Sequence, residues 1–108
     1  MNKEKIIKKS ETFTEIISKK QSIKNKYFSI YYQPSKNSNK YGITVPKKTG
    51  KANIRNKIKR QIKNIIIQNE NYIQTNFDYV IIIKEAILDL TYNDIQKELL
   101  ELLKKVSK

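Results

Sequence analysis

The 108-residue sequence predicts one small domain of mixed helices and strands, in the order α, β, β, α, β, α. Apolar residues recur with helical spacing in three segments and in strand-like patterns in three others, and helices and strands are interspersed along the chain. The length suits a single core that buries roughly 65% of the surface of the unfolded chain. We therefore expect residues 1–108 to form one domain, with residues 1–9 as a flexible basic tail.

The first predicted element is a short amphipathic helix over residues 10–19. It begins at Ser10, a residue type that often caps helices, and Phe13, Ile16 and Ile17 fall on one face at helical spacing.

Two strands are predicted next, over residues 27–33 and 41–46. Side chains alternate in the first strand, so Tyr27, Ser29 and Tyr31 are expected on the opposite side from the three residues Phe28, Ile30 and Tyr32. The second strand ends at Pro46, because proline cannot donate to a sheet, and a basic turn follows it.

A helix over residues 53–69, a strand over 78–84 and a C-terminal helix complete the pattern. The strand is almost continuously β-branched, which is typical of a strand covered on both faces. The last helix opens with a capping box formed by Thr91 and Asp94.

The net charge of +13, from 23 basic and ten acidic residues, exceeds the roughly 2 to 8 that solubility favours in a small domain. A sequence rich in Lys, Asn and Ile could owe some lysines to an AT-rich genome. Such a bias exchanges Arg for Lys, however, and need not create a surplus of charge. The charge therefore indicates a polyanionic partner, with nucleic acid favoured over an anionic membrane.

Arg55 and Arg60 are the two arginines of the chain, and both lie in the predicted helix over residues 53–69. At 100° per residue, one arc of about 120° is apolar and is expected to pack on a sheet; it holds Ile54, Ile58, Ile62, Ile65 and Ile66. The adjoining 140° or so holds Arg55, Asn56, Lys59, Arg60 and Lys63. The cationic face has no acidic residue between Lys51 and Gln68. Arginine presents a planar fork of donors that can hold a phosphate with two bonds, so this face indicates a nucleic-acid backbone.

The composition excludes several classes of site. There is no cysteine and no histidine, which removes disulfides, thiolate metal sites and the commonest general base. The run Thr49-Gly50-Lys51 fails the P-loop pattern, because its first glycine is misplaced and Ala52 follows the lysine. Without a membrane-spanning run or a secretory signal, we expect a cytoplasmic protein with no membrane partner and no small-molecule substrate.

The run YGITVPKKTGKANIRNKIKRQIKN, residues 41–64, resembles the bacterial ribonuclease P protein component. That family has a strand ending in Lys-Lys, a glycine turn, an alanine, and then Arg-Asn-Arg followed by Lys-Arg. The matching positions are Gly42, Lys47, Lys48, Gly50, Ala52, Arg55, Asn56, Lys59 and Arg60. Lys57 stands where the family has a second arginine, and Pro46 where a serine is commoner. The resemblance extends over nearly the whole chain.

The resemblance implies an α+β fold: a small two-layer sandwich with a mixed four-stranded sheet, of a kind also found in a ribosomal protein domain. It also implies a left-handed βαβ crossover through the basic helix, against the strong right-handed default. The fourth strand would be a short one before Tyr27.

The function implied by the resemblance is that of the protein subunit of ribonuclease P, which removes the 5′ leader from precursor tRNA. The RNA subunit would hold the active site, and Mg²⁺ would be bound mainly through RNA. The residues implied to bind the RNA subunit are Lys47, Lys48, Lys51, Arg55, Asn56, Lys57, Lys59, Arg60 and Lys63.

The resemblance also implies a cleft for the single-stranded leader, formed by the first helix and the open sheet face. Its residues would be Phe13, Ile17, Ser29 and Tyr31. An aromatic floor with a basic rim suits single-stranded RNA, because stacking is worth roughly 1 to 3 kcal/mol per base and tolerates any sequence. The residues alone favour ordinary core positions for Phe13 and Ile17, and the resemblance reverses that preference.

Two alternatives share the charge and size. A ribosomal or rRNA-assembly protein would bind RNA without a catalytic partner. A nuclease in its own right would need clustered carboxylates, whereas the ten acidic residues are scattered.

Overall fold

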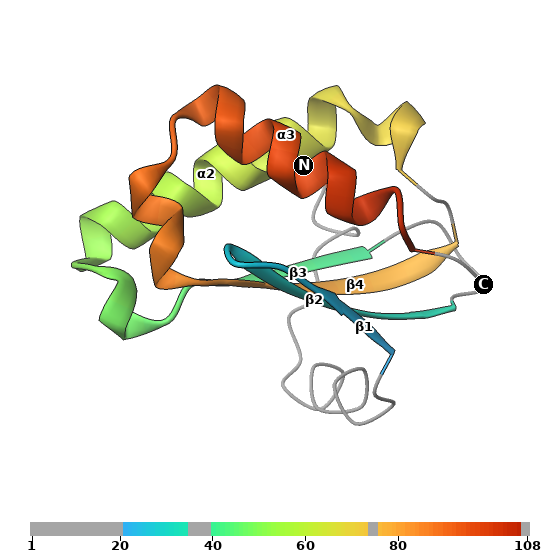
Figure 1. Ribbon diagram of the computed structural model, residues 1–108, viewed down its shortest axis with the longest axis horizontal. Helices are drawn as coiled ribbons and strands as arrows, with labels where there is room; N and C mark the ends of the chain where they lie inside the picture. Colours follow the sequence, from blue (N-terminus) through green and yellow to red (C-terminus); the bar gives the residue numbers. More distant parts are fainter. Residues whose placement is uncertain (1–20, 35–39, 74–75, 107–108) are drawn as a thin grey trace.

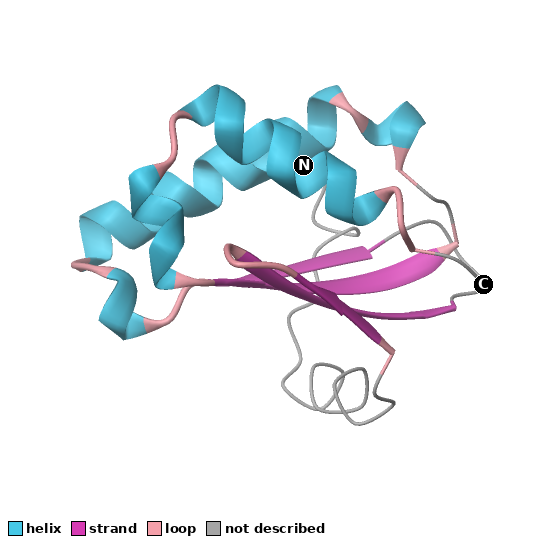
Figure 2. Cartoon of the chain, viewed as in Figure 1, coloured by secondary structure: helices cyan, strands magenta, loops and turns pink. Residues whose placement is uncertain are grey.

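The computed structural model of the protein describes residues 21–34, 40–73 and 76–106, which form two layers (Figure 1). One layer is a sheet, and two helices lie side by side over one of its faces (Figure 2). The strands are β1 (Ser22–Lys24), β2 (Phe28–Pro34), β3 (Lys40–Thr44) and β4 (Phe77–Ile83). The helices are α2 (Ala52–Gln68) and α3 (Tyr92–Leu103), with 3₁₀ turns η2 (Lys47–Thr49), η3 (Glu70–Tyr72) and η4 (Glu85–Asp89). The helix predicted over residues 10–19 and the predicted tail lie outside the described residues.

The sheet is mixed, and its strand order is β1-β2-β4-β3. β2 pairs antiparallel with β1 and β4, whereas β3 runs parallel to β4. The connection between these two parallel neighbours carries α2 over the sheet, and it is left-handed (Figure 1). The sheet thus has the mixed four-stranded form that the resemblance implies, including the short first strand.

The turn between β1 and β2 is closed by Asn25. Its Oδ1 accepts hydrogen bonds from the backbone N–H groups of Tyr27 and Phe28, both at 2.8 Å. The Lys84 ammonium, just after β4, donates to the Asn25 carbonyl at 2.7 Å. An Asx turn of this kind replaces the missing backbone bonds of a hairpin end, and the lysine ties that end to the central strand.

The core lies between the sheet and the two helices. Alternate residues of β2 and β4, including Phe28, Ile30, Tyr79 and Ile81, face the helices and are fully buried. Tyr41 of β3 stacks on Tyr79, with ring centroids 5.5 Å apart. The helices contribute Ile58, Ile62, Ile65 and Ile66 from α2 and Ile95, Leu99, Leu102 and Leu103 from α3.

Most predicted bounds agree with the structure within one or two residues. The strand expected to reach Pro46 ends at Thr44, because Val45 and Pro46 lead into η2. Tyr27 precedes β2 and packs against the helix-side core, so its predicted place beside Ser29 and Tyr31 is wrong. The 3₁₀ turns were not predicted, since three to five residues carry too little periodicity.

Candidate nucleic-acid interface

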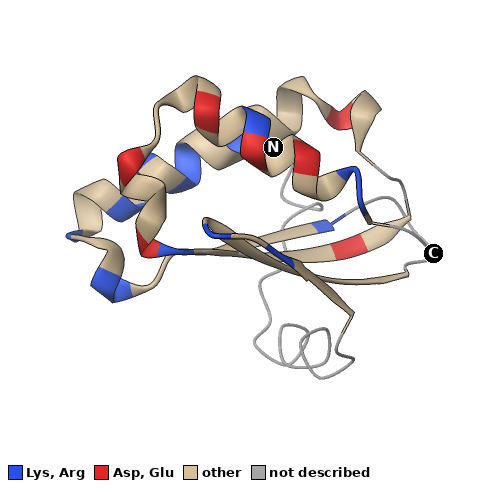
Figure 3. Cartoon of the chain, viewed as in Figure 1, with Lys and Arg blue, Asp and Glu red and all other residues tan. Residues whose placement is uncertain are grey.

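The basic side chains of α2 are placed by the burial of its isoleucines. Because Ile58, Ile62, Ile65 and Ile66 pack into the core, the rest of the helix perimeter faces outward. Figure 3 shows the resulting Lys and Arg positions along α2. Among the predicted residues, Lys51, Asn56, Lys57 and Arg60 are exposed, and Arg55, Lys59 and Lys63 are half-buried.

The charge of this helix is not neutralised within the part of the chain that the structure describes. The first turn contains no acidic residue, and the N-cap Lys51 offers no side-chain hydrogen bond. No ion pair joins an α2 cation to a described carboxylate. The free N–H groups and the positive end of the helix dipole therefore add to the field of the side chains.

Arg55 differs from its neighbours on α2 because its unpaired hydrogen-bond donor is buried. Its Nε atom is buried, and it has no hydrogen-bond partner among the described residues. Arg55, Lys59 and Lys63 follow each other at intervals of four, so like charges are stacked along one side of the helix. Few buried donors in folded proteins remain unpaired, so Arg55 stands out on this face.

The turn before α2 brings Lys47 and Lys48 to the start of the basic helix. The Thr49 and Gly50 N–H groups donate to the Pro46 and Lys47 carbonyls at 3.0 and 3.3 Å. A Cβ at Gly50 would stand 3.2 Å from the Ile54 side chain, so glycine lets the turn pack closely on the helix. Both lysines are exposed.

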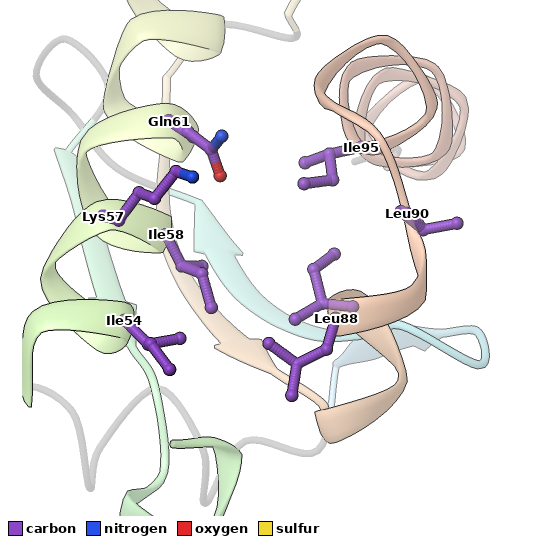
Figure 4. Close-up of a pocket in the computed structure, with 8 residues that line it drawn as sticks. Ile54, Lys57, Ile58, Gln61, Leu88, Leu90 and Ile95 are labelled. Carbon is purple, nitrogen blue, oxygen red and sulfur yellow. The ribbon is translucent and has the colours of Figure 1, made fainter. Parts of the chain in front are cut away.

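Lys57 lies at the margin of the cationic face, on the side of α2 that faces η4 and α3. There it lines a pocket with Ile54, Ile58 and Gln61 of the same helix (Figure 4). Ile54 was expected to pack on the sheet with the other isoleucines, and that expectation is wrong. It is 38% exposed, because the first turn of α2 lies beyond the buried stretch that begins at Ile58.

Ser29 and Tyr31 lie on the face of the sheet opposite α2 and α3. Tyr31 pairs across the strands with Ser22 and Val80, and it packs against Val80. The Lys24 ammonium lies 5.5 Å from the centre of the Tyr31 ring. Sequence reasoning missed Lys24, and only the hairpin register of β1 could have revealed it. Phe13 and Ile17 lie outside the described residues.

β4 was predicted to be covered on both faces, and Val80 is fully buried even though no described helix lies over it. Its neighbours on that face, Asp78 and Ile82, are half-buried. The Gln33 amide donates to Asp78 Oδ2 at 3.4 Å, so the face also carries polar groups. It is therefore a mixed apolar, aromatic and polar surface with Lys24 near Tyr31.

The described residues contain no group of three or more Asp, Glu, His or Cys side chains that could hold a metal ion. No helix among them is long and apolar enough to cross a bilayer.

Comparison with known proteins gives consistent matches over almost the whole chain. The family model described as "Ribonuclease P" matches residues 1–107. The chain is 44% identical to the ribonuclease P protein component of Mycoplasma mycoides, covering 98% of this chain and 99% of that protein. It is 36% identical to the corresponding component of a Geobacillus species, covering 97% and 92%.

Solved structures are similar as well. The RNase P protein from Thermotoga maritima superposes with a TM-score of 0.87 at 29% identity, covering 94% of this chain and 97% of that one. The Staphylococcus aureus RNase P protein gives a TM-score of 0.86 at 34% identity, covering 93% of each chain.

Proposed function

Since the chain belongs to the ribonuclease P protein family, we propose that α2 docks on the RNA subunit and that the open sheet face binds the precursor tRNA leader. The protein is a subunit of the ribonucleoprotein that removes the 5′ leader from precursor tRNA. A ribosomal role is not favoured, because the relatives and structural neighbours named above are ribonuclease P proteins.

The observation that carries the first part is the acid-free face of α2. Cations four residues apart on a helix repel each other, which costs a few tenths of a kcal/mol per pair in the free protein. A phosphate backbone relieves this repulsion and releases its own counterions. We assign the contact to Lys47, Lys48, Lys51, Arg55, Asn56, Lys59, Arg60 and Lys63, with Lys57 at its margin.

The second part rests on Tyr31 and its surroundings. A half-exposed aromatic ring beside the Lys24 ammonium offers a stacking surface and a positive charge to a flexible strand. Ser29, two residues earlier on the same face, is too small to stack and leaves room for the strand. Phe13 and Ile17 complete this cleft in the proposal.

We assign catalysis to the RNA subunit, with the protein alone inactive. Mg²⁺ would be held mainly by RNA, since the described residues offer no cluster of metal ligands. In this scheme the protein raises the local positive charge and positions the leader, in the cytoplasm where precursor tRNA is processed.

Reconstitution tests the proposal. A bacterial ribonuclease P RNA is incubated with precursor tRNA at low Mg²⁺, with and without the protein. We expect leader removal only when both subunits are present. A protein that binds RNA but rescues cleavage with no RNA subunit would overturn the proposal in favour of the ribosomal alternative. Cleavage by protein alone, after removal of contaminating nucleases, would contradict the assignment of catalysis to RNA.

Two variants separate the two surfaces. Arg60→Ala should weaken binding to the RNA subunit and lower the slope of log K against log salt by about one unit. Tyr31→Ala should impair binding of precursor tRNA but leave mature tRNA unaffected. An unchanged slope removes Arg60 from the interface, and equal losses for both tRNAs remove Tyr31 from the leader cleft.

A further inference from the structure

A pocket of about 200 Å³ lies beside the basic face, between the first half of α2 and the segment from η4 to the start of α3. Figure 4 shows Ile54 and Ile58 facing Leu88 and Ile95 across the gap. Ile54 and Leu88 are 38% and 51% exposed, although most large apolar side chains of the described residues are buried. Adjacent exposed apolar residues at a concave site commonly mark a place that a partner covers.

The polar groups of the pocket stand on α2. Lys57 and Gln61 are one helical turn apart, and both side chains project into the gap (Figure 4). Neither side chain forms a hydrogen bond or ion pair with another described residue. The pocket therefore combines two apolar walls with one cation and one amide, and the amide can both donate and accept.

These features suit one unstacked nucleobase. The volume is below the roughly 300 to 1,000 Å³ of clefts that bury a drug-sized ligand, so it suits a single flat ring system. It is also too small for the three or four anchor side chains of a docked peptide helix. Apolar walls can hold the faces of a base, an amide can bind its edge, and a lysine can bind the attached phosphate.

The position of the pocket agrees with this ligand. Lys57 lies three residues before Arg60, so the two cations are neighbours on the helix surface. An RNA backbone that passes from Arg60 to Lys57 would bring its bases to the mouth of the pocket. We propose that this pocket binds a single extruded base of the RNA subunit, an inference that rests on the docking of α2 on that RNA.

Leu88→Trp tests the inference, because it fills the mouth of the pocket from η4 and alters no cation. Tyr72→Trp is the matched control, since Tyr72 is 70% exposed, lies in η3 and is not among the lining residues. Binding of a bacterial ribonuclease P RNA is measured over a range of salt concentrations. Chemical probing, with dimethyl sulfate for A and C and a carbodiimide for U and G, then reports which bases each complex protects. Thermal melting verifies that both variants fold.

We expect Leu88→Trp to weaken RNA binding roughly tenfold, as loss of one stacked base should, with an unchanged salt slope. One base protected by the wild-type protein and by Tyr72→Trp should become reactive. Gln61→Leu should weaken binding less, and expose the same base. Unchanged affinity, or weaker binding with an unchanged protection pattern, would overturn the inference and leave an apolar peptide as the occupant to test.

The same experiment separates this inference from the proposed function. If Arg60→Ala still lowers the salt slope while Leu88→Trp has no effect, α2 docks on RNA but the pocket takes no base. If the wild-type protein does not bind the RNA, both proposals fail together.

Discussion

α2 and α3 lie over the same face of one sheet, yet their polar sides differ in almost every respect. Each buries an apolar stripe, represented by Ile62 in α2 and Leu99 in α3. α3 is capped by the Thr91 hydroxyl, which accepts a hydrogen bond from the Asp94 N–H at 3.3 Å. α2 begins at Lys51 without such a bond, and its five cations have no acidic neighbour in the helix.

The comparison separates what the fold needs from what the interface needs. The apolar stripes attach both helices to the sheet, so neither polar side is required for packing. α3 uses its polar side in the way that stabilises a helix, with a cap and an acid in the first turn. The charge of α2 is not compensated by any described residue, so it does not stabilise the described part of the free protein, and it favours a polyanionic partner.

Shortening a buried side chain in either apolar stripe should give the largest loss of stability. The free energy of unfolding should fall by the same amount for α2 and for α3. Ile62→Ala and Leu99→Ala each remove a fully buried side chain, so each should lower the free energy of unfolding by about 2 to 5 kcal/mol. Urea denaturation measures both. A loss below about 1 kcal/mol in one of them would show that the stripes are not equivalent.

Removing charge from α2 should affect binding and leave stability intact. The double substitution Lys59→Gln and Lys63→Gln should lower the slope of log K against log salt by about 1.4 to 1.8 units for RNA-subunit binding. The free energy of unfolding should stay constant or rise by a few tenths of a kcal/mol, because stacked like charges are lost.

The matched control is Lys97→Gln with Lys104→Gln at α3, where both lysines are exposed. It removes the same net charge from the other helix. Equal changes of slope in the two double variants would mean that only total charge matters, and that α2 has no special role.

Substitutions at the two helix caps should change the free energy of unfolding by smaller amounts. The change should be a decrease at the cap of α3 and an increase at that of α2. Thr91→Ala should lower the free energy of unfolding by about 1 kcal/mol, since the cap of α3 is lost. Lys51→Ser gives α2 a capping side chain, so it should raise the free energy of unfolding by about 0.5 kcal/mol or more. The same substitution should weaken RNA binding. Chemical denaturation and RNA titration test both signs. Tighter RNA binding by Lys51→Ser would contradict a role of Lys51 in docking.

The smallest expected effect is a change in stability at alkaline pH. It arises from Tyr79, in the sheet beneath both helices. Burial, with smaller contributions from Tyr41 and Tyr32, raises the pKa of the Tyr79 hydroxyl above its ordinary value. Above about pH 10 the unfolded chain loses this proton while the folded protein keeps it. The contribution of Tyr79 to stability is therefore complete below that pH and is lost as the pH rises through the folded pKa.

Tyr79→Phe should make the stability of the protein less sensitive to a rise in pH in the alkaline range. The free energy of unfolding of the variant should fall less than that of the wild type between about pH 9 and about pH 11.5. Identical declines would show that other groups dominate alkaline unfolding.

Much of the fold follows from local pattern. The bounds of α2 and β4 differ by one residue at each end from those that periodicity predicts. The Thr91 cap of α3 is confirmed as well. Such features depend on residues close in sequence, whose spacing decides which face of an element is apolar.

The prediction for Ile54 was wrong for a physical reason. The angle of a residue around the helix axis tells in which direction its side chain points. It does not tell whether the sheet extends far enough along the helix to cover that side chain. For the same reason, the sequence did not predict that Lys57 faces η4 and α3 across a pocket.

The sequence by itself therefore determined the positions of β2, β3, β4, α2 and α3, and that the cationic face of α2 contains no acidic residue. Only the tertiary structure decided the strand order, the proximity of Lys24 to Tyr31, the burial of Val80 and the pocket between α2 and η4. Each of these depends on contacts between residues far apart in the chain, which local periodicity does not encode.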